Sequence, residues 1–117
     1  MSTADTPSVS IVVPVYNGMP YLPAALDSAL DQDYANLEIV VIDNASTDGT
    51  TKYLESVRNP LVRVVYREST QPAADNWSEA IAHAQGNFVK LMCADDLLAP
   101  GAITSQVALL TMHSEAG

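Results

Sequence analysis

Three polar pairs, each placed directly after an apolar run, are the residues of this sequence best suited to chemistry. They are Tyr16-Asn17, Asp43-Asn44 and Asp95-Asp96. If each apolar run is a strand of a parallel sheet, the three pairs meet at the edge where the strands' carboxyl ends point, which is where such sheets bind ligands. Adjacent carboxylates at a buried strand end repel each other, so the last pair predicts a hard divalent cation. Asp43 fits either a ligand contact or a plain helix cap.

The elements that must position these pairs alternate regularly along the chain. Short β-branched apolar runs, typical of strands buried on both faces, occupy 9–15, 37–42, 61–66 and 88–93. Helical spacing of apolar residues follows each run, first over about 20–32, then around 53–57, then before Gly86, and finally from Pro100 with Ile103, Val107 and Leu110 facing inward. The alternation predicts an α/β fold, a Rossmann-like parallel sheet of about four strands with alternating helices and right-handed crossovers.

Local signals add finer expectations. Pro14 should end the regular pairing of the first strand. Asn76 is expected to cap the third helix with Glu79 three residues on, and Gly86 to end it in a left-handed conformation. A core role is expected for Trp77, Met92 and Tyr66, and Trp77 should share the inner face of its helix with Ala80, Ile81 and Ala84. Tyr16, at a strand end, fits either a core role or stacking on a base or sugar.

Composition limits the class of protein. The 117 residues suit one domain, with residues 1–8 as a flexible lead, and a net charge of −9 disfavours nucleic acid and anionic membranes as partners. No apolar run approaches the roughly 20 residues that span a bilayer, and the start lacks the features of a signal peptide. With Cys93 as the single cysteine, neither an intrachain disulfide nor a multi-cysteine zinc site is expected. These features predict a cytoplasmic protein.

Common motifs for dinucleotides, phosphate loops, zinc proteases and serine hydrolases do not occur in the sequence. His83 and His113 lie in predicted helices without metal-ligand spacing and are interpreted as structural or solvent-facing. The five basic residues are scattered and form no anion cradle, so a phosphate ester would need a metal ion to supply most of the countercharge.

Taken in order, segments 9–17, 37–50, 80–88 and 93–96 resemble the nucleotide-binding half of family 2 glycosyltransferases with the GT-A fold. The resemblance spans about Val9 to Leu110 and implies that residues 9–117 are the nucleotide-sugar-binding portion of a truncated GT-A domain. It implies a nucleotide-diphosphate sugar donor of the UDP, GDP or dTDP type. The residues implied in binding that donor are Pro14, Val15, Tyr16, Asp43, Asn44 and Asp95.

The resemblance also implies a mechanism. Asp95 and Asp96 match the DXD region and would be the catalytic residues: Asp96 as ligand of a Mg²⁺ or Mn²⁺ that bridges the diphosphate, Asp95 positioning the sugar or ribose. A hydroxyl of a saccharide or lipid-linked acceptor then attacks the anomeric carbon, usually with inversion. Three positions depart from the family pattern: Cys93 and Asn44 stand where aspartates are frequent, and Asp75 where arginine is common.

The acceptor half of the family, with its general base, would lie beyond Gly117, so the chain by itself is expected to be weakly active or inactive. A truncated face also predicts self-association. The location would be cytoplasmic, either free or at the inner face of the membrane.

Two other classes remain as alternatives. One is a non-catalytic nucleotide-sugar-binding remnant. The other is a Mg²⁺-binding receiver-like signalling domain, which fits poorly because it needs an acidic pair after the first strand, where this chain has Tyr16-Asn17.

Overall fold

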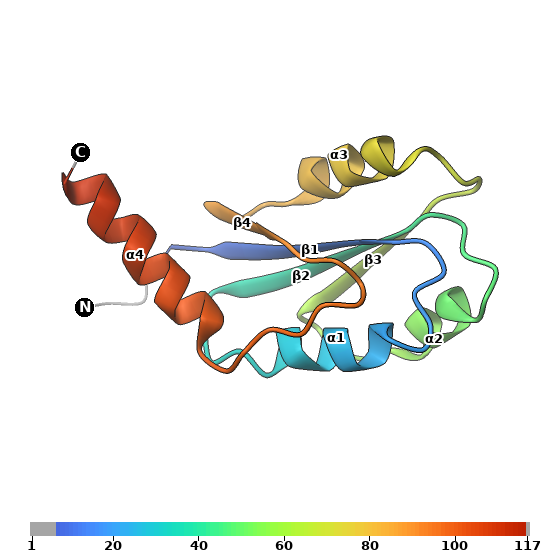
Figure 1. The fold of residues 1–117 in the computed structure, drawn as a ribbon, viewed down its shortest axis with the longest axis horizontal. Coiled ribbons are helices and arrows are strands. Elements are labelled where there is room, and N and C mark those ends of the chain that lie inside the picture. The colour runs from blue at the N-terminus through green and yellow to red at the C-terminus, as the bar shows by residue number, and fades with distance from the viewer. Residues whose placement is uncertain (1–6, 117) are drawn as a thin grey trace.

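The computed structural model describes residues 7–116, and it describes side chains as far as residue 109. Strands and helices alternate through these residues, as the sequence predicts (Figure 1). The elements in chain order are β1 (Val9–Val15), α1 (Leu22–Leu30), β2 (Leu37–Asp43), α2 (Thr50–Ser56), β3 (Val62–Tyr66), α3 (Ala73–His83), β4 (Phe88–Leu91) and α4 (Ala102–Ala116).

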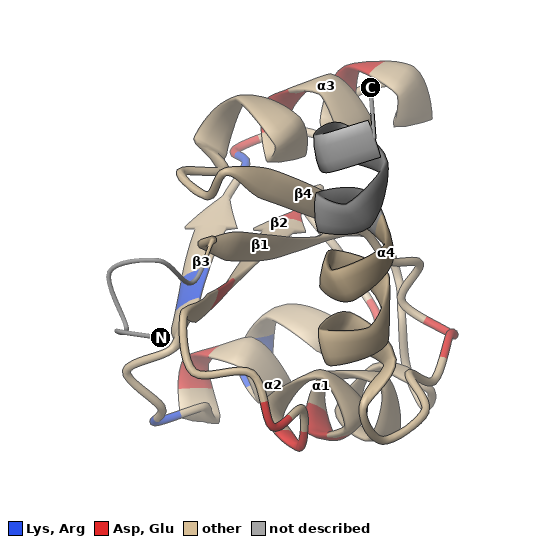
Figure 2. Cartoon of the chain, turned by 90° about the vertical axis from the view of Figure 1, so that its left-hand side faces the viewer, with Lys and Arg blue, Asp and Glu red and all other residues tan. Residues whose placement is uncertain are grey.

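The four strands form one parallel sheet in the order β3-β2-β1-β4. Helices cover both faces, with α1 and α2 on one and α3 on the other, and Figure 2 shows these layers end-on. Side chains alternate between the faces: Ile11 and Ile39 pack with α1 and α2, whereas Val12 and Val40 pack with Ala80 of α3. Burial on both faces explains why β1 and β2 are almost continuously apolar. The predicted α/β fold is confirmed.

Pro14 does not end the pairing of β1 on both sides. It remains in register with Ile42 of β2, whereas the pairing of β1 with β4 stops at Val12. Val12 O accepts from Met92 N, and Val15 O accepts from Asn44 N. Since successive residues address opposite neighbours, the missing N–H of Pro14 faces the β4 side, where pairing has already stopped.

The third helix differs from expectation at both ends. It begins at Ala73, so Asn76 is not its cap but a buried residue inside it, whose Nδ2 lies 3.5 Å from Ile42 O. The helix ends at His83, followed by an extended Ala84, and Gly86 has no positive φ. Gly86 is needed for a close approach instead, because a Cβ there would lie 2.8 Å from Ser10 N.

The predicted core is wrong at several aromatic and apolar positions. Met92 is buried as expected, but Tyr66, Trp77 and Ile81 are 44%, 39% and 48% exposed. The sheet-facing stripe of α3 consists of the smaller Asn76 and Ala80, which rotates Trp77 and Ile81 toward solvent.

The expected flexible lead, residues 1–8, is described only in part. Ser8 exchanges hydrogen bonds with Asn87, whereas residues 1–6 lie outside the described part. The side chains of Leu110 and His113 also lie outside it. None of the described helices is long and apolar enough to span a bilayer.

Candidate functional site

A cavity of about 280 Å³ lies at the carboxyl end of β1, beside the segment that follows β4. The chain turns sharply there because Asn17 adopts a left-handed conformation, with φ of 53°. The cavity is lined by Pro14, Val15, Tyr16, Asn17, Gly18, Tyr21, Ala94 and Asp95. The structure therefore brings together four of the six predicted donor-binding residues, from segments about 80 residues apart in the sequence.

Two tyrosines and one glycine shape this cavity. Tyr16 and Tyr21 are 50% and 63% exposed, so both rings are available to a ligand. Gly18 lies so close to its neighbours that an added Cβ would be 2.6 Å from Val15 Cγ2 and 3.3 Å from Ala94 Cβ. Tyr21 was not predicted from the sequence, because it is the residue just before α1 and does not directly follow a strand. Its one signal was its position just after the turn that ends β1.

Asp43, at the end of β2, is buried and does not line the cavity. Its Oδ1 accepts a hydrogen bond from Ser46 N at 3.1 Å, and its Oδ2 accepts one from the hydroxyl of Thr51 in α2. The carboxylate therefore holds the loop after β2 but does not cap α2, whose N-cap residue is Gly49 and has no side-chain cap hydrogen bond, so the plain helix cap that the sequence left open is wrong. Each carboxylate oxygen keeps one lone pair for a further donor.

Asn44 is buried as well and faces away from the cavity, toward the loop before α3. Its Nδ2 donates to Gln71 O at 2.8 Å, and its Oδ1 accepts from Gln71 N at 2.9 Å. The side-chain amide is thus engaged on both sides by protein backbone.

Asp95 and Asp96 lie in the turn after β4, which ends at Leu91, two residues earlier than predicted. Both are exposed, in contrast to the buried strand end that was expected, so water screens their mutual repulsion. Asp96 Oδ2 accepts from Cys93 N at 3.3 Å. Within the described residues no three His, Cys, Asp or Glu side chains gather into a metal-binding group. Two carboxylates still suit Mg²⁺ or Mn²⁺, because such ions commonly take one or two carboxylates and complete their shell with substrate phosphates and water.

The negative charge of this turn affects the pKa of Cys93. Burial raises the pKa of its thiol, and the carboxylates of Asp96 and Asp95 raise that pKa further. The thiol is therefore protonated at neutral pH, which agrees with a packing role and not with a nucleophile.

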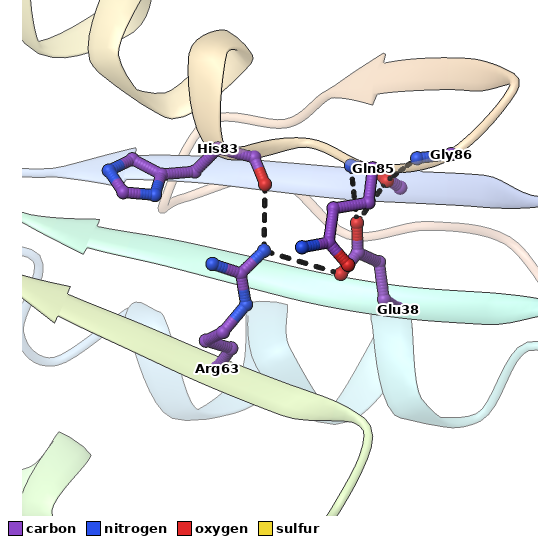
Figure 3. A network of polar contacts seen from close by, with 6 residues as sticks. Glu38, Arg63, His83, Gln85 and Gly86 are labelled. Atoms are coloured by element: carbon purple, nitrogen blue, oxygen red, sulfur yellow. Dashed lines mark hydrogen bonds and ion pairs between the residues drawn. The ribbon is translucent and has the colours of Figure 1, made fainter.

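A second cavity of about 240 Å³ lies at the opposite edge of the sheet, where β1 and β2 begin. Figure 3 shows the polar network beside it. Glu38 Oε2 accepts from Ser10 Oγ at 2.5 Å and from Gln85 N at 2.8 Å, and Arg63 lies 3.5 Å from Glu38 Oε1. Arg63 also donates to His83 O at 2.7 Å. These polar groups are hydrogen-bonded to one another and join the end of α3 to the sheet. We therefore assign the residues beside this cavity a structural role.

Comparison with known proteins identifies the family. Residues 10–116 match the family model of glycosyl transferase family 2. The chain belongs to this family. Among curated relatives of this family 2 chain, the uncharacterized protein y4gI of Sinorhizobium fredii is 37% identical over 94% of the chain and 12% of its own length. The putative teichuronic acid biosynthesis glycosyltransferase TuaG of Bacillus subtilis is 35% identical over 77% of the chain and 36% of its own length.

Solved structures of similar fold are glycosyltransferases too. S. aureus TarS in complex with UDP-GlcNAc superposes with a TM-score of 0.76 at 29% identity, over 92% of this chain and 32% of that one. The mannosyltransferase PcManGT from Pyrobaculum calidifontis, in complex with GDP-Man and Mn²⁺, gives a TM-score of 0.73 at 34% identity, over 88% and 31%. The family 2 chain thus spans about a third of the chains in these two solved structures, and its sheet is the GT-A type sheet that they share.

Proposed function

We propose that this chain binds a nucleotide-diphosphate sugar at the carboxyl edge of its sheet and forms the donor-binding half of a metal-assisted, inverting glycosyltransferase. The observation that carries the proposal is the cavity between the β1 turn and Asp95, which two exposed tyrosines and an aspartate line together. The complexes of similar proteins with UDP-GlcNAc and with GDP-Man and Mn²⁺ support it.

The roles of the individual residues follow from their places. The backbone of Pro14 and Val15 and the ring of Tyr16 would contact the base, with Asp43 beneath it at the end of β2. Asp95, at the cavity wall, would orient the ribose or the donor sugar. Asn44, also proposed to bind the donor, has its side-chain amide engaged by the backbone of Gln71.

Asp96, with Asp95 beside it, would hold Mg²⁺ or Mn²⁺ against the diphosphate. When bound, the ion neutralises charge that develops on the leaving nucleoside diphosphate. An oxygen of the acceptor hydroxyl forms a bond to the anomeric carbon as the bond from that carbon to the diphosphate oxygen breaks. The electron pair leaves with the diphosphate, and the hydroxyl proton passes to a general base. Because the chain spans only about a third of the glycosyltransferase chains that it matches, we expect it by itself to transfer sugar weakly or not at all.

The acceptor would be a saccharide or a lipid-linked saccharide, in the cytoplasm or at the inner face of the membrane. The second candidate function is a non-catalytic remnant that only binds nucleotide sugars. The observation that favours it is that the chain spans only 12% and 36% of the length of the two relatives above. Hydrolysis or transfer of the donor distinguishes the two.

The test is calorimetric titration of UDP, GDP and dTDP, each with and without Mn²⁺. We expect one nucleotide to bind more tightly with Mn²⁺ present, and Asp96→Ala to lose that dependence. Asp31→Ala is the matched control, because it removes one exposed carboxylate at the far end of α1. Absence of binding by all three nucleotides with Mn²⁺ would refute the proposal, and an unchanged metal dependence in Asp96→Ala would refute the role of Asp96.

A further inference from the structure

Two of the side chains that join the loops after β1 and β2, those of Thr50 and Asp48, do not line the cavity. Thr50, the first residue of α2, is fully buried, and its Oγ1 accepts a hydrogen bond from Gly18 N at 3.0 Å. The same hydroxyl donates to Asp48 Oδ1 at 2.6 Å. The bonds form a directional chain from the Gly18 amide through Thr50 to the Asp48 carboxylate, in which the charge strengthens the second bond.

Asp48 also holds the next residue of the β1 loop directly. Its Oδ2 accepts from Met19 N at 3.1 Å, while its Oδ1 accepts from Thr50 N at 3.1 Å. The hydrogen bond from Thr50 is the main reason why the pKa of Asp48 lies below its ordinary value, and the bond from Met19 adds to it. The carboxylate is thus ionised at neutral pH and fixes two consecutive amides of the cavity loop, one directly and one through Thr50.

Asn17, in the loop after β1, also bonds to the loop after β2. Its backbone N donates to Ser46 Oγ at 2.9 Å, and its Oδ1 accepts from Thr47 N at 2.7 Å. The left-handed backbone of Asn17 is therefore held by the loop after β2. Without these bonds the turn would be free to relax toward more common backbone angles.

We infer that Asp48 and Thr50 are positioning residues for the proposed donor site: they fix the backbone at Gly18 and Met19, between Tyr16 and Tyr21, and thereby the spacing of the two tyrosines around the cavity. The inference rests on the proposed function, since it assigns these residues to the same site. Neither residue lines the cavity, so their effect on a ligand must pass through the loop.

The test uses three substitutions at these positions and one control elsewhere. Thr50→Val keeps the shape of the side chain and removes the hydroxyl, while Thr50→Ser restores it. Asp48→Asn keeps one acceptor but presents an amide N–H₂ to the N–H of Met19 or Thr50. Thr104→Val is the matched control, because its hydroxyl bonds to Asp33 at an exposed position at the start of α4.

Two measurements are made on each variant: amide hydrogen exchange, and affinity for the nucleotide that wild type binds best in the presence of Mn²⁺. In Thr50→Val we expect the Gly18 and Met19 amides to exchange about tenfold faster and affinity to fall about tenfold, the effect of losing roughly one to two hydrogen bonds. Asp48→Asn should move the same two readouts in the same direction, and Thr50→Ser should restore both. Thr104→Val should change neither.

The outcomes separate the two proposals. If wild type binds no nucleotide, the proposed function fails, and this inference fails with it. If wild type binds and both Thr50→Val and Asp48→Asn bind equally well, only the positioning role is refuted. Faster exchange at Gly18 with unchanged affinity also refutes it, because the bonds would then serve the fold and not the site.

Discussion

The side-chain amide of Asn44 and the backbone of Gln71 exchange two hydrogen bonds, of 2.8 and 2.9 Å. This pair joins the end of β2 to the loop that leads from β3 into α3, across 27 residues of sequence. An amide can form such a pair because it carries both a donor and an acceptor, whereas a carboxylate carries acceptors only. This pair of hydrogen bonds explains structurally why position 44 holds an asparagine and not an aspartate.

Asn44→Asp should lower the free energy of unfolding by about 1–3 kcal/mol, because a buried carboxylate would face the carbonyl oxygen of Gln71 without a donor. Urea unfolding at pH 7 measures the change. Asn59→Asp is the control, since Asn59 uses only its Oδ1, to accept from Leu61 N, and an aspartate retains that acceptor. Equal losses in the two variants would contradict the assigned role of Asn44.

The sheet could be predicted from the sequence because its two central strands, β1 and β2, are buried on both faces. The β1 and β2 segments therefore appear as uninterrupted β-branched runs, and their order along the chain leaves few alternatives to a parallel sheet. The inner face of α3 could not be predicted in the same way. An apolar pattern favours Trp77 and Ile81, but the sheet accepts the smaller Ala80 and Asn76, and that choice depends on how closely the helix approaches.

The sequence predicts at which edge of the sheet the site lies, but not which residues line its cavity. Strand ends locate Tyr16, Asp43 and Asp95 at one edge, because all parallel strands point there. Which of them border the cavity depends on the path of the loops, above all on the left-handed turn at Asn17, which no spacing rule reveals. Tyr21 lines the cavity because the chain turns at Asn17.

Glu38 should make stability depend on pH. Burial alone would raise the pKa of Glu38, but hydrogen bonds from Ser10, Gln85 N and Arg63 outweigh it and lower that pKa (Figure 3). A carboxyl group with a lowered pKa in the folded state contributes stability above its unfolded pKa of about 4.3, and this is lost as pH falls through the folded value.

Glu38→Gln should therefore lower the free energy of unfolding by roughly 1–2 kcal/mol at pH 7, and the difference from wild type should shrink below about pH 4. Urea unfolding across this pH range measures it. Glu68→Gln, at an exposed position, should show no such difference at any pH. A gap between wild type and Glu38→Gln that stays constant down to pH 3 would argue against a charge effect.

Gly18→Ala should damage both the fold and the cavity. The new methyl group would lie 2.6 Å from Val15 Cγ2, so the loop must shift, at a cost of about 1–3 kcal/mol. Nucleotide affinity should fall with it. Gly101→Ala is the control: its added Cβ meets no atom, but its φ of 77° makes alanine unfavourable by about 1–2 kcal/mol. Calorimetric titration should find unchanged affinity in that control, and equal affinity loss in both variants would show that stability alone sets binding.

Cys93 gives a chemical probe of the carboxylates beside it. Because burial and then Asp96 and Asp95 raise the pKa of its thiol, alkylation by iodoacetamide should be slow at pH 7 and should speed up only above the ordinary thiol range. Asp96→Asn removes one of the negative charges, so its rate profile should shift to lower pH. Asp31→Asn, at the far end of α1, should leave the profile in place. A profile that Asp96→Asn does not move would mean that burial alone holds the thiol protonated, and that the charge of this turn has little effect on Cys93.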